Sequence, residues 1–380
     1  MSYKEEMKEL RQEINSLDDA MLDTFGKRME LSKKVAVIKR NYNMAVQDID
    51  RENEIVKRAV QNCNPELKSE TALLMRNILA LSCEYQNRLL FSGDAPMLPA
   101  SGTPVTENII CAHQGVRGAW SEQASVSLFP DAELKTVSHF EDVFTAVKNG
   151  DVHYGVVPIE NSETGAIGET YDLLRKYGCY IVGRTWISIR QNLVGTTDAE
   201  ISDIREVLSH PEGLKQCSRY LQNHPWEQTA CRNTAVAAQK VAEENDKKKA
   251  AISSVFAAEL YGLKVLAPDI MDSASNRTSF VVIAKQPEYD ETSDLISVTF
   301  STQHRSGALC ETLMAFIADN LNLMRIESRP AASGKYRFFV EIQGNINDSK
   351  VLSALRHAAA CSEYFEVLGC YSCSNSEGSV

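Results

Sequence analysis

The chain has 380 residues, which is enough for two or three domains of ordinary size. Hydrophobic residues make up 43% and charged residues 24%, a balance typical of a protein that folds around apolar cores. The formal net charge of −11 argues against nucleic acid or an anionic membrane surface as the main partner. The first 92 residues are electrically neutral, so a small anionic substrate requires a local cluster of Arg and Lys.

No part of the sequence has the pattern of a membrane or export segment. The first residues, MSYKEEMKEL, contain no apolar run, and no run elsewhere approaches the ~18 residues that span a bilayer. We therefore expect a cytoplasmic protein without a membrane partner. The ten cysteines are scattered, and the close pair Cys370 and Cys373 is weak evidence for a metal. Reduced, mostly buried thiols are expected.

Three regions of different character follow one another along the chain. Residues 1–92 show helical periodicity and no strand pattern, and the Pro/Gly-rich residues 93–106 are typical of a linker. Residues 107–286 alternate apolar runs with helical stretches, which predicts an α/β domain. Residues 294–375 predict a ferredoxin-like βαββαβ order. Its expected strands are 295–302, 323–328, 336–343 and 365–371, and its helices 308–320 and 349–360.

The first helix of the all-helical region is expected to run from about Lys4 to Arg40, with an apolar stripe from Leu10 to Ile38. At 1.5 Å per residue it is roughly 55 Å long, which is longer than a small domain is wide. A second chain must cover such a rod, so we expect a dimer with interlocked helices. Further helices are expected after Asp48 and over residues 65–91.

Several polar residues of this region fall on shared helix faces. Arg28 and Lys39 are three turns apart on one face. The same holds, at spacings of three or four residues, for Asp48, Arg51 and Glu52, and for Ser82 and Gln86. Arg11 is rotated roughly 100° from Arg28, so it cannot easily serve the same pocket within one chain. Each residue alone could equally be a solvated charge on a long helix.

This array, covering the whole region, strongly resembles the all-helical chorismate mutases. Their reaction is a pericyclic rearrangement, so the protein must hold a dicarboxylate in its compact conformer and stabilise charge on the breaking ether oxygen. The resemblance implies that Arg28 and the partner's Arg11 bind the carboxylates. Lys39 and Gln86 would donate to the ether oxygen, and Glu52 would hold the ring hydroxyl. The resemblance implies further cage contacts from Asp48, Arg51 and Ser82.

The middle region carries several blocks that resemble prephenate dehydratase. They are Gly115-Val-Arg-Gly-Ala-Trp-Ser121, Tyr154-Gly-Val-Val-Pro-Ile-Glu-Asn-Ser162, Ser209-His-Pro211, Asn233-Thr-Ala235, Ala257-Ala-Glu-Leu-Tyr-Gly262 and Asn276-Arg-Thr-Ser-Phe280. The resemblance implies two α/β lobes, similar to periplasmic binding proteins, with the substrate in the cleft. Prephenate loses CO₂ and its ring hydroxyl together, so the site needs a donor for the leaving hydroxyl and polar groups for two carboxylates.

By this resemblance, Thr278 lies nearest the leaving hydroxyl and Glu160 is a second catalytic residue. The other residues implied to bind prephenate are Asn161, Ser162, Ser209, His210, Gln216, Thr234 and Arg277. His210 could instead be a turn residue, and residues 160–162 could be capping residues. The sequence departs from the family pattern at Val116, Ala119 and Trp120, and the usual Thr-Arg-Phe reads Thr278-Ser279-Phe280, with the arginine shifted to Arg277.

The tail resembles the ACT regulatory domains of dehydratases. Its two signatures are Gly307-Ala308-Leu309 and Glu327-Ser328-Arg329-Pro330, which the resemblance implies form an L-phenylalanine site at a dimer interface. A helix N-terminus offers backbone N–H groups to a carboxylate, and glycine permits close approach. Feedback inhibition by L-phenylalanine is therefore expected. The alternative is a tail that only dimerises.

Together these patterns predict a bifunctional enzyme, an isomerase and a lyase, that converts chorismate to phenylpyruvate. The alternative is a chorismate mutase fused to a catalytically silent amino-acid-sensing module. A periplasmic-type binding protein is disfavoured because the sequence lacks a signal-peptide pattern. No His/Cys cluster or nucleotide loop indicates a metal or cofactor. Left open are the choice between prephenate and arogenate, channelling, and pairing of dimers into tetramers.

Overall fold

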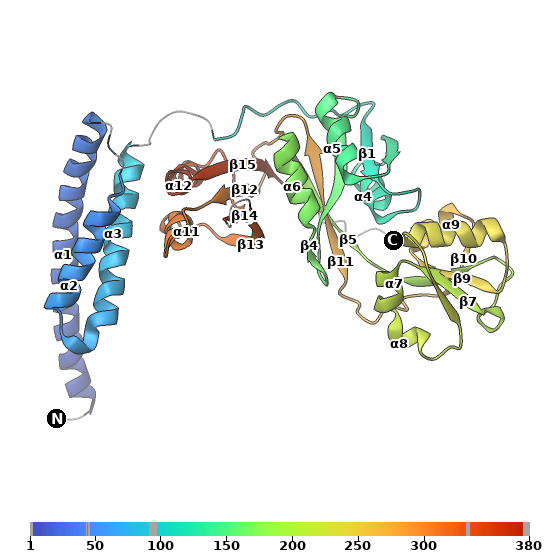
Figure 1. Cartoon of the computed structure of the whole chain (residues 1–380), viewed down its shortest axis with the longest axis horizontal. Helices are drawn as coiled ribbons and strands as arrows, with labels where there is room; N and C mark the ends of the chain where they lie inside the picture. The colour runs from blue at the N-terminus through green and yellow to red at the C-terminus, as the bar shows by residue number, and fades with distance from the viewer. Residues whose placement is uncertain (1–2, 43, 45, 91–96, 332–334, 375–380) are drawn as a thin grey trace.

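The computed structural model describes residues 3–42, 44, 46–90, 97–331 and 335–374. Its amino-terminal part is a bundle of long helices (Figure 1). The elements are α1 (Tyr3–Asn41), α2 (Ile49–Asn62), the 3₁₀ turn η1 (Pro65–Leu67) and α3 (Lys68–Leu90). Asp48 caps α2 by accepting a hydrogen bond from the Arg51 N–H at 3.0 Å, and the expected all-helical region is confirmed.

The apolar stripe of α1 is exposed to solvent along its length. Leu17 is 66% exposed and Leu22 is 68% exposed, while the only buried residues of α1 are Ser32 and Ala36. α1 packs against α3 over part of its length. The remaining apolar face has no partner among the described residues of this chain. The expected second chain therefore stays a prediction.

The α/β part begins with a seven-stranded sheet. Six of its strands have the order β16-β5-β11-β3-β1-β2, and the seventh, β4, pairs with β3. Its strands are β1 (Ile110–Gln114), β2 (Glu133–Val137), β3 (Tyr154–Asn161), β4 (Gly165–Ala166), β5 (Tyr180–Ser188), β11 (Arg277–Ala284) and β16 (Cys373–Ser374). Its helices are α4 (Trp120–Leu128), α5 (Phe140–Asn149) and α6 (Gly168–Tyr177). Strand residues alternate between the two faces, so Val157 and Val281 pack with α5 and α6, while Val156 and Phe280 pack with α4.

A five-stranded sheet of order β10-β6-β9-β7-β8 forms a second lobe. Its elements are β6 (Asn192–Gly195), η2 (Ile201–Asp203), β7 (Glu206–Ser209), α7 (Pro211–Gln216), α8 (Ser218–Leu221), β8 (Glu227–Ala230), α9 (Thr234–Glu244), β9 (Lys249–Ser253), α10 (Val255–Leu260) and β10 (Lys264–Ala267). Helices cover both faces, with Cys217 and Leu221 on one side and Ala237 and Ala257 on the other. The chain crosses between the lobes after β5 and returns in β11.

The tail is a four-stranded antiparallel sheet of order β13-β14-β12-β15 with two helices. Its elements are β12 (Leu295–Ser301), α11 (Ala308–Ala318), β13 (Leu323–Pro330), β14 (Tyr336–Gln343), α12 (Ser349–Ala360) and β15 (Tyr364–Tyr371). The expected βαββαβ order is confirmed, and each expected element is found to within about two residues at its ends. The tail lies between the helical bundle and the α/β part (Figure 1).

One face of the tail sheet shares a hydrophobic core with the seven-stranded sheet. Phe339, Leu368 and Tyr371 belong to the same buried cluster as α5 and α6, and the rings of Phe339 and Tyr171 are 4.5 Å apart. At Gly369 a Cβ would lie 2.0 Å from the backbone oxygen of Ile181, so glycine permits this close approach. The tail is therefore packed directly against the seven-stranded sheet.

Residues 93–96 of the expected linker 93–106 lie outside the described residues. The rest of the linker is packed against the folded parts of the chain. Leu98 is 2% exposed within the tail core, and the Gly102 N–H donates to the Pro287 carbonyl at 2.8 Å. The ten cysteines are all free thiols; four are buried, and only Cys310 is exposed. No helix among the described residues combines the length and hydropathy needed to cross a membrane.

Candidate functional sites

A first cluster of predicted residues lies between α1 and α3. The Arg28 guanidinium donates to the Ser82 hydroxyl and lies 3.5 Å from the Ile78 carbonyl. Partial burial lowers the pKa of Arg28. Gln86 is buried; its amide donates to the Ser82 carbonyl at 3.1 Å, while its Oε1 has no hydrogen-bond partner among the described residues. A buried polar atom without a partner fits a site that a ligand completes.

The loop from α1 to α2 positions two further predicted residues. The Lys39 ammonium donates to the Val46 carbonyl. Glu52 accepts a hydrogen bond from the Cys83 thiol of α3 at 3.2 Å. Burial, followed by the charge of Glu52, raises the pKa of Cys83 to about 12, so this thiol stays protonated.

The other predicted chorismate residues are not brought to this cluster within one chain. Asp48 and Arg51 are exposed, and Arg51 pairs with Glu54 at 2.9 Å. Arg11 is exposed on the same continuous helix as Arg28, seventeen residues and therefore about 25 Å away along the axis. That distance excludes Arg11 from the Arg28 pocket of its own chain.

A pocket of about 660 Å³ separates α2 and α3 from the tail. Glu52 lines it from the helices, and Arg305 and Glu311 line it from the tail. Arg305 donates to the Gln47 side chain at 3.0 Å and forms an ion pair with Glu311. The pocket therefore lies at the interface between the two regions. Among the described residues that line it, Glu52 is the only predicted chorismate residue.

A second cluster of predicted residues lies where β3 and β11 meet. The Asn161 amide donates to the Thr278 hydroxyl at 3.0 Å and to Asn276 Oδ1 at 2.8 Å. Its Oδ1 accepts from the N–H groups of Glu163 and Thr164, so Asn161 also closes a turn. The Ser162 hydroxyl accepts from the Arg277 N–H at 3.0 Å. Thr278 itself is 9% exposed.

A β-bulge decides which side chains share a face with Thr278. Ser279 pairs with Glu160, but Phe280 pairs with Pro158, so Ile159 is an extra residue in β3. Glu160 and Ser279 therefore face the tail, whereas Asn161 and Thr278 face the opposite side. Glu160 forms ion pairs with Arg184 at 3.3 Å and Arg325 at 3.0 Å.

Two of the expected prephenate residues, Glu160 and Arg277, are not brought to the Thr278 face within this chain. Arg277 is two residues from Ser279 on the same face, and its guanidinium lies 4.4 Å from the Trp186 ring centroid. Because side chains alternate along a strand, both Glu160 and Arg277 point away from the Thr278 face. The bulge and the strand register, which carry no local sequence signal, account for this.

The remaining predicted prephenate residues lie in the second lobe. The Ser209 hydroxyl donates to the Ile252 carbonyl at 2.8 Å, and Thr234 is the first residue of α9. A Cβ at Gly213 would touch both, at 2.7 Å from Ser209 Oγ and 3.4 Å from Thr234 Cγ2. His210, for which a turn role was the alternative, caps α7 by accepting from the Glu212 N–H at 3.2 Å.

The glycine loop before α4 has alanine at position 119, so it offers no hydroxyl there. Ala119 is the N-cap of α4 and makes no side-chain cap. The Glu122 carboxylate, 7% exposed, instead accepts from the Gly118 N–H. Gly118 has a φ of +83°, and a Cβ there would lie 3.1 Å from the Ala257 Cβ of the second lobe, so the loop needs glycine for two reasons.

In the tail, Gly307 and Leu309 line a pocket of about 470 Å³ at the start of α11. Residues 327–330 are on the edge strand β13 and are not among the described residues that line this pocket. Arg329 instead reaches α6, where it lies 3.6 Å from Asp172 and covers Gly168. One chain therefore does not combine the two signatures in one pocket.

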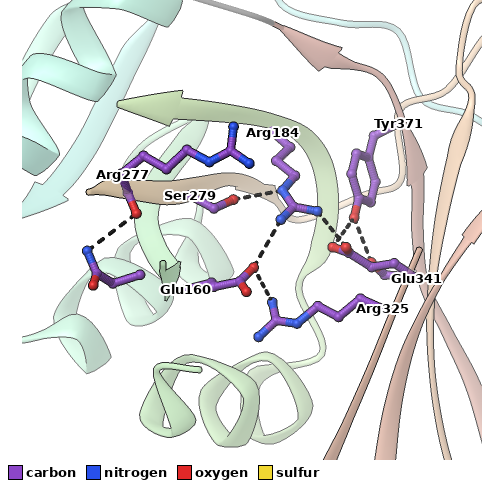
Figure 2. A network of polar contacts seen from close by, with 9 residues as sticks. Glu160, Arg184, Arg277, Ser279, Arg325, Glu341 and Tyr371 are labelled. Atoms are coloured by element: carbon purple, nitrogen blue, oxygen red, sulfur yellow. Dashed lines mark hydrogen bonds and ion pairs between the residues drawn. The ribbon is translucent and has the colours of Figure 1, made fainter. Parts of the chain in front are cut away.

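Sequence reasoning missed two buried charged residues, Arg184 and Glu341, and the partly buried Arg325 (Figure 2). A signal was present for Glu341, which stands between the apolar residues Val340 and Ile342, where an unpaired charge is rarely tolerated. The described residues contain no group of three or more His, Cys, Asp or Glu side chains placed to hold a metal ion.

The fold and these clusters define a fused enzyme with a helical anion-binding part, a two-lobed α/β part and a ferredoxin-like tail. Residues 10–87 match the family model for chorismate mutase type II, and residues 111–288 match that for prephenate dehydratase. The bifunctional chorismate mutase/prephenate dehydratase of Escherichia coli (strain K12) is 30% identical over 96% of each chain. The chain belongs to this bifunctional family and has both enzyme domains.

Two other relatives bear on the α/β part. Arogenate dehydratase/prephenate dehydratase 2 from Arabidopsis thaliana is 36% identical over 73% of this chain and 78% of its own. The structure of prephenate dehydratase in complex with L-Phe from Arthrobacter aurescens is 28% identical, has a TM-score of 0.63, and covers 70% of this chain and 90% of that one. The α/β fold expected from the sequence is thereby confirmed.

Proposed function

We propose that residues 1–92 rearrange chorismate to prephenate and residues 107–286 convert prephenate to phenylpyruvate. Residues 93–106 connect these parts, and residues 294–375 are an ACT-type regulatory tail. The observation that carries the proposal is the match to a bifunctional relative over 96% of both chains. An assay of the purified chain with chorismate, following prephenate and phenylpyruvate, tests both steps. Accumulation of prephenate without phenylpyruvate would instead favour the silent sensing module.

In the proposed mutase site, Arg28 binds one substrate carboxylate and Arg11 of the partner binds the other. Arg28 already reaches Ser82, and a bound carboxylate would take the rest of its fork of donors. Lys39 and Gln86 stabilise negative charge on the ether oxygen as the C–O bond breaks. Glu52 holds the ring hydroxyl, and Asp48, Arg51 and Ser82 complete the cage. Because the reaction is pericyclic, positioning and charge stabilisation suffice.

The proposal requires a homodimer in which α1 of each chain supplies Arg11 to the other site. Support comes from the exposed apolar stripe of α1 and the separation of Arg11 from Arg28. Mixing the inactive variants Arg11→Ala and Lys39→Ala, with exchange of chains, tests it. A mixed dimer holds one intact site, so random exchange of equal amounts should restore about a quarter of wild-type mutase activity. A mixture that stays inactive after exchange would exclude the shared site.

In the proposed dehydratase site, Thr278 donates a hydrogen bond to the departing ring hydroxyl. Asn161 donates to Thr278 Oγ1, which leaves the threonine hydroxyl hydrogen available for the substrate. Electrons from the carbon–carbon bond that releases CO₂ complete the aromatic ring, and the hydroxyl leaves as water after gaining a proton. Asn161 and Ser162 from one lobe and Ser209, His210, Gln216 and Thr234 from the other bind the substrate.

Arogenate is a second candidate substrate for the dehydratase site. The 36% identical relative from Arabidopsis is named for both arogenate and prephenate. Arogenate differs from prephenate by an amino group in place of the side-chain keto group, so the same elimination yields phenylalanine. Comparing kcat/KM for the two substrates on the purified chain decides between them. A ratio above about tenfold, equivalent to about 1.4 kcal/mol, identifies the preferred one.

We also propose that L-phenylalanine binds the tail and inhibits the enzyme. Support comes from the pocket at Gly307, where the N-terminus of α11 offers N–H groups to a carboxylate, and from a related structure determined with L-Phe. Glu327, Ser328, Arg329 and Pro330 lie on the edge strand β13, which is open to pairing with a second chain. Ala308 and Leu309 would complete the pocket from the first chain. Activity that is insensitive to millimolar L-phenylalanine would refute this regulation.

A further inference from the structure

A buried charge network joins the dehydratase sheet to the tail, and Arg184 of β5 lies at its centre (Figure 2). Arg184 is 6% exposed, and each nitrogen of its guanidinium has a partner. Nε donates to Ser279 Oγ at 2.7 Å, Nη1 to Glu341 Oε2 at 2.5 Å, and Nη2 to Glu160 Oε2 at 3.3 Å. One planar group therefore fixes three residues from three other strands.

The carboxylates of this network are held from the tail as well. Arg325 of β13 contacts Glu160 at 3.0 Å, and the Tyr371 hydroxyl lies 3.3 Å from Glu341 Oε1. Burial is the largest single effect on Arg184 and lowers its pKa. Glu341, Tyr371 and Glu160 together outweigh burial and raise the pKa, so the guanidinium remains charged. A charge buried in this way requires its partners, which makes the geometry of the group sensitive to them.

The network adjoins the proposed catalytic pair through the backbone. Glu160 directly precedes Asn161, and Ser279 directly follows Thr278. The two pairs are opposite each other in the ladder, with Glu160 beside Ser279 and Asn161 beside Thr278. Arg184 thus forms hydrogen bonds with Glu160 and Ser279, which are the chain neighbours of Asn161 and Thr278. Because side chains alternate, it does so from the face opposite to the substrate.

Arg184 also supplies a guanidinium at the position where the motif Thr278-Ser279-Phe280 has serine. The short Ser279 side chain leaves room for the side chain of the neighbouring strand, and its hydroxyl accepts a hydrogen bond from it. Arg277, the nearest arginine in sequence, instead lies on Trp186, which also contacts Arg184 at 4.9 Å from its ring centroid to the guanidinium carbon. The two arginines flank one indole ring and are not interchangeable.

We propose, on the basis of the proposed dehydratase function, that Arg184 is a positioning residue for that reaction and that Glu341 of the tail holds it in place. Arg184 fixes Ser279 and Glu160, and through them the separation of Thr278 and Asn161. The tail is then part of the dehydration site even though none of its residues touches substrate. A shift of β14 or β13 would move Arg184 or Glu160 and alter the aim of the Thr278 hydroxyl.

The variants Glu341→Gln and Arg184→Lys of the full chain test this role. Glu341→Gln keeps the shape of the side chain but removes its charge, and Arg184→Lys keeps the charge but loses the planar fork. Since a misplacement of about 1 Å can cost 10²-fold in rate, we expect dehydratase kcat to fall about 10- to 100-fold. KM should change by less than about threefold, because substrate contacts remain. Mutase activity in the same sample should be unchanged.

The matched control is Glu206→Gln, which removes a partly exposed ion pair with Lys249 at the first residues of β7 and β9 in the second lobe. It should leave dehydratase kcat within about twofold of wild type, because the loss of a distant, partly exposed ion pair usually has little effect. If Glu341→Gln does not fold, Ser279→Ala removes a single hydrogen bond and should still lower kcat several-fold at an unchanged melting temperature. L-Phenylalanine inhibition should also weaken in Glu341→Gln, a change that lost stability alone does not produce.

Folded variants with dehydratase kcat within twofold of wild type would overturn the role of Arg184. Equal losses in Glu341→Gln and Glu206→Gln would also overturn it, because any lost ion pair would then have the same effect. A wild-type chain without activity on prephenate or arogenate would instead refute the proposed function, and the role of Arg184 with it. Active wild type with unaffected variants refutes the positioning role alone.

Discussion

The two proposed active sites differ in how far one chain completes them. In the helical region Arg11 is about 25 Å from Arg28 along α1, and apolar side chains lie open to solvent. In the α/β region Thr278 is buried, hydrogen-bonded and fixed by strand register. A pericyclic reaction needs a charged cage, which faces of two helices from different chains can form. An elimination needs one hydroxyl aimed accurately, which a sheet within one chain provides.

The largest effect is expected from Thr278→Val, which keeps the side-chain shape and removes the hydroxyl. Loss of the group that assists the departing hydroxyl should lower dehydratase kcat by about 10²- to 10⁴-fold. Mutase activity should be unaffected, since the two sites share no residue. Steady-state assays of both reactions on one preparation measure this. A variant with near-normal phenylpyruvate formation would remove Thr278 from the chemistry.

Lys39→Ala should produce the reverse pattern. Removing a donor to the ether oxygen should reduce mutase kcat by about 10²- to 10³-fold. The helix should tolerate the change, because alanine has the highest helix propensity. Thermal unfolding monitored beside the kinetics separates the two effects. Near-normal turnover would refute the assignment of the helical site.

The dependence of the mutase on a second chain is tested by Leu17→Glu in the exposed stripe of α1. A charge in an apolar interface should raise the dimer dissociation constant by on the order of 10²-fold. Mutase activity should then fall on dilution while dehydratase activity per chain changes less. The control is Asn15→Glu, about 200° around the helix on the polar side. Equal behaviour of both variants would contradict the interlocked dimer.

The smallest effect concerns Cys83, whose pKa of about 12 reflects burial and then the charge of Glu52. Because the thiolate is the reactive form, iodoacetamide at pH 8.5 should label the exposed Cys310 well before Cys83. Raising the pH toward 12 should increase labelling of Cys83. Glu52→Gln removes a negative neighbour, which lowers the pKa and should speed labelling modestly. Mass spectrometry of labelled peptides gives both rates, and equal rates at pH 8.5 would contradict the buried Glu52–Cys83 contact.

Much of the fold could be predicted because its signals are local. The tail strand 336–343 and helix 349–360 were expected at the residues where they occur, and Asp348 caps the helix by accepting from the Lys350 N–H. In the helical region, the shared face of Arg28 and Lys39 depends only on the geometry of one helix. The meeting of Arg28 with Ser82 on another helix was implied by the family resemblance and not by spacing.

The orientation of the dehydratase residues could not be predicted, because it depends on pairing between distant strands. The extra residue Ile159 forms a β-bulge that turns Glu160 toward the tail. The amino-acid sequence of residues 154–162 gives no sign of this bulge. Arg184, Glu341 and Arg325 come together from three elements separated by up to 157 residues. The one local indication is the charge of Glu341 between the apolar Val340 and Ile342, which implies that a partner exists.

The last strand, β16, has a consequence for any shortened form of this protein. After the tail, the chain returns and pairs in parallel with β5, the strand that carries Arg184. The tail is thus connected to the seven-stranded sheet at both ends, through β11 and β16. Residues 373–374 cover the otherwise open edge of β5. A truncation before residue 294 would remove the proposed L-phenylalanine sensor and also uncover a strand edge prone to self-association. Lost activity in such a fragment would therefore report on aggregation as much as on control.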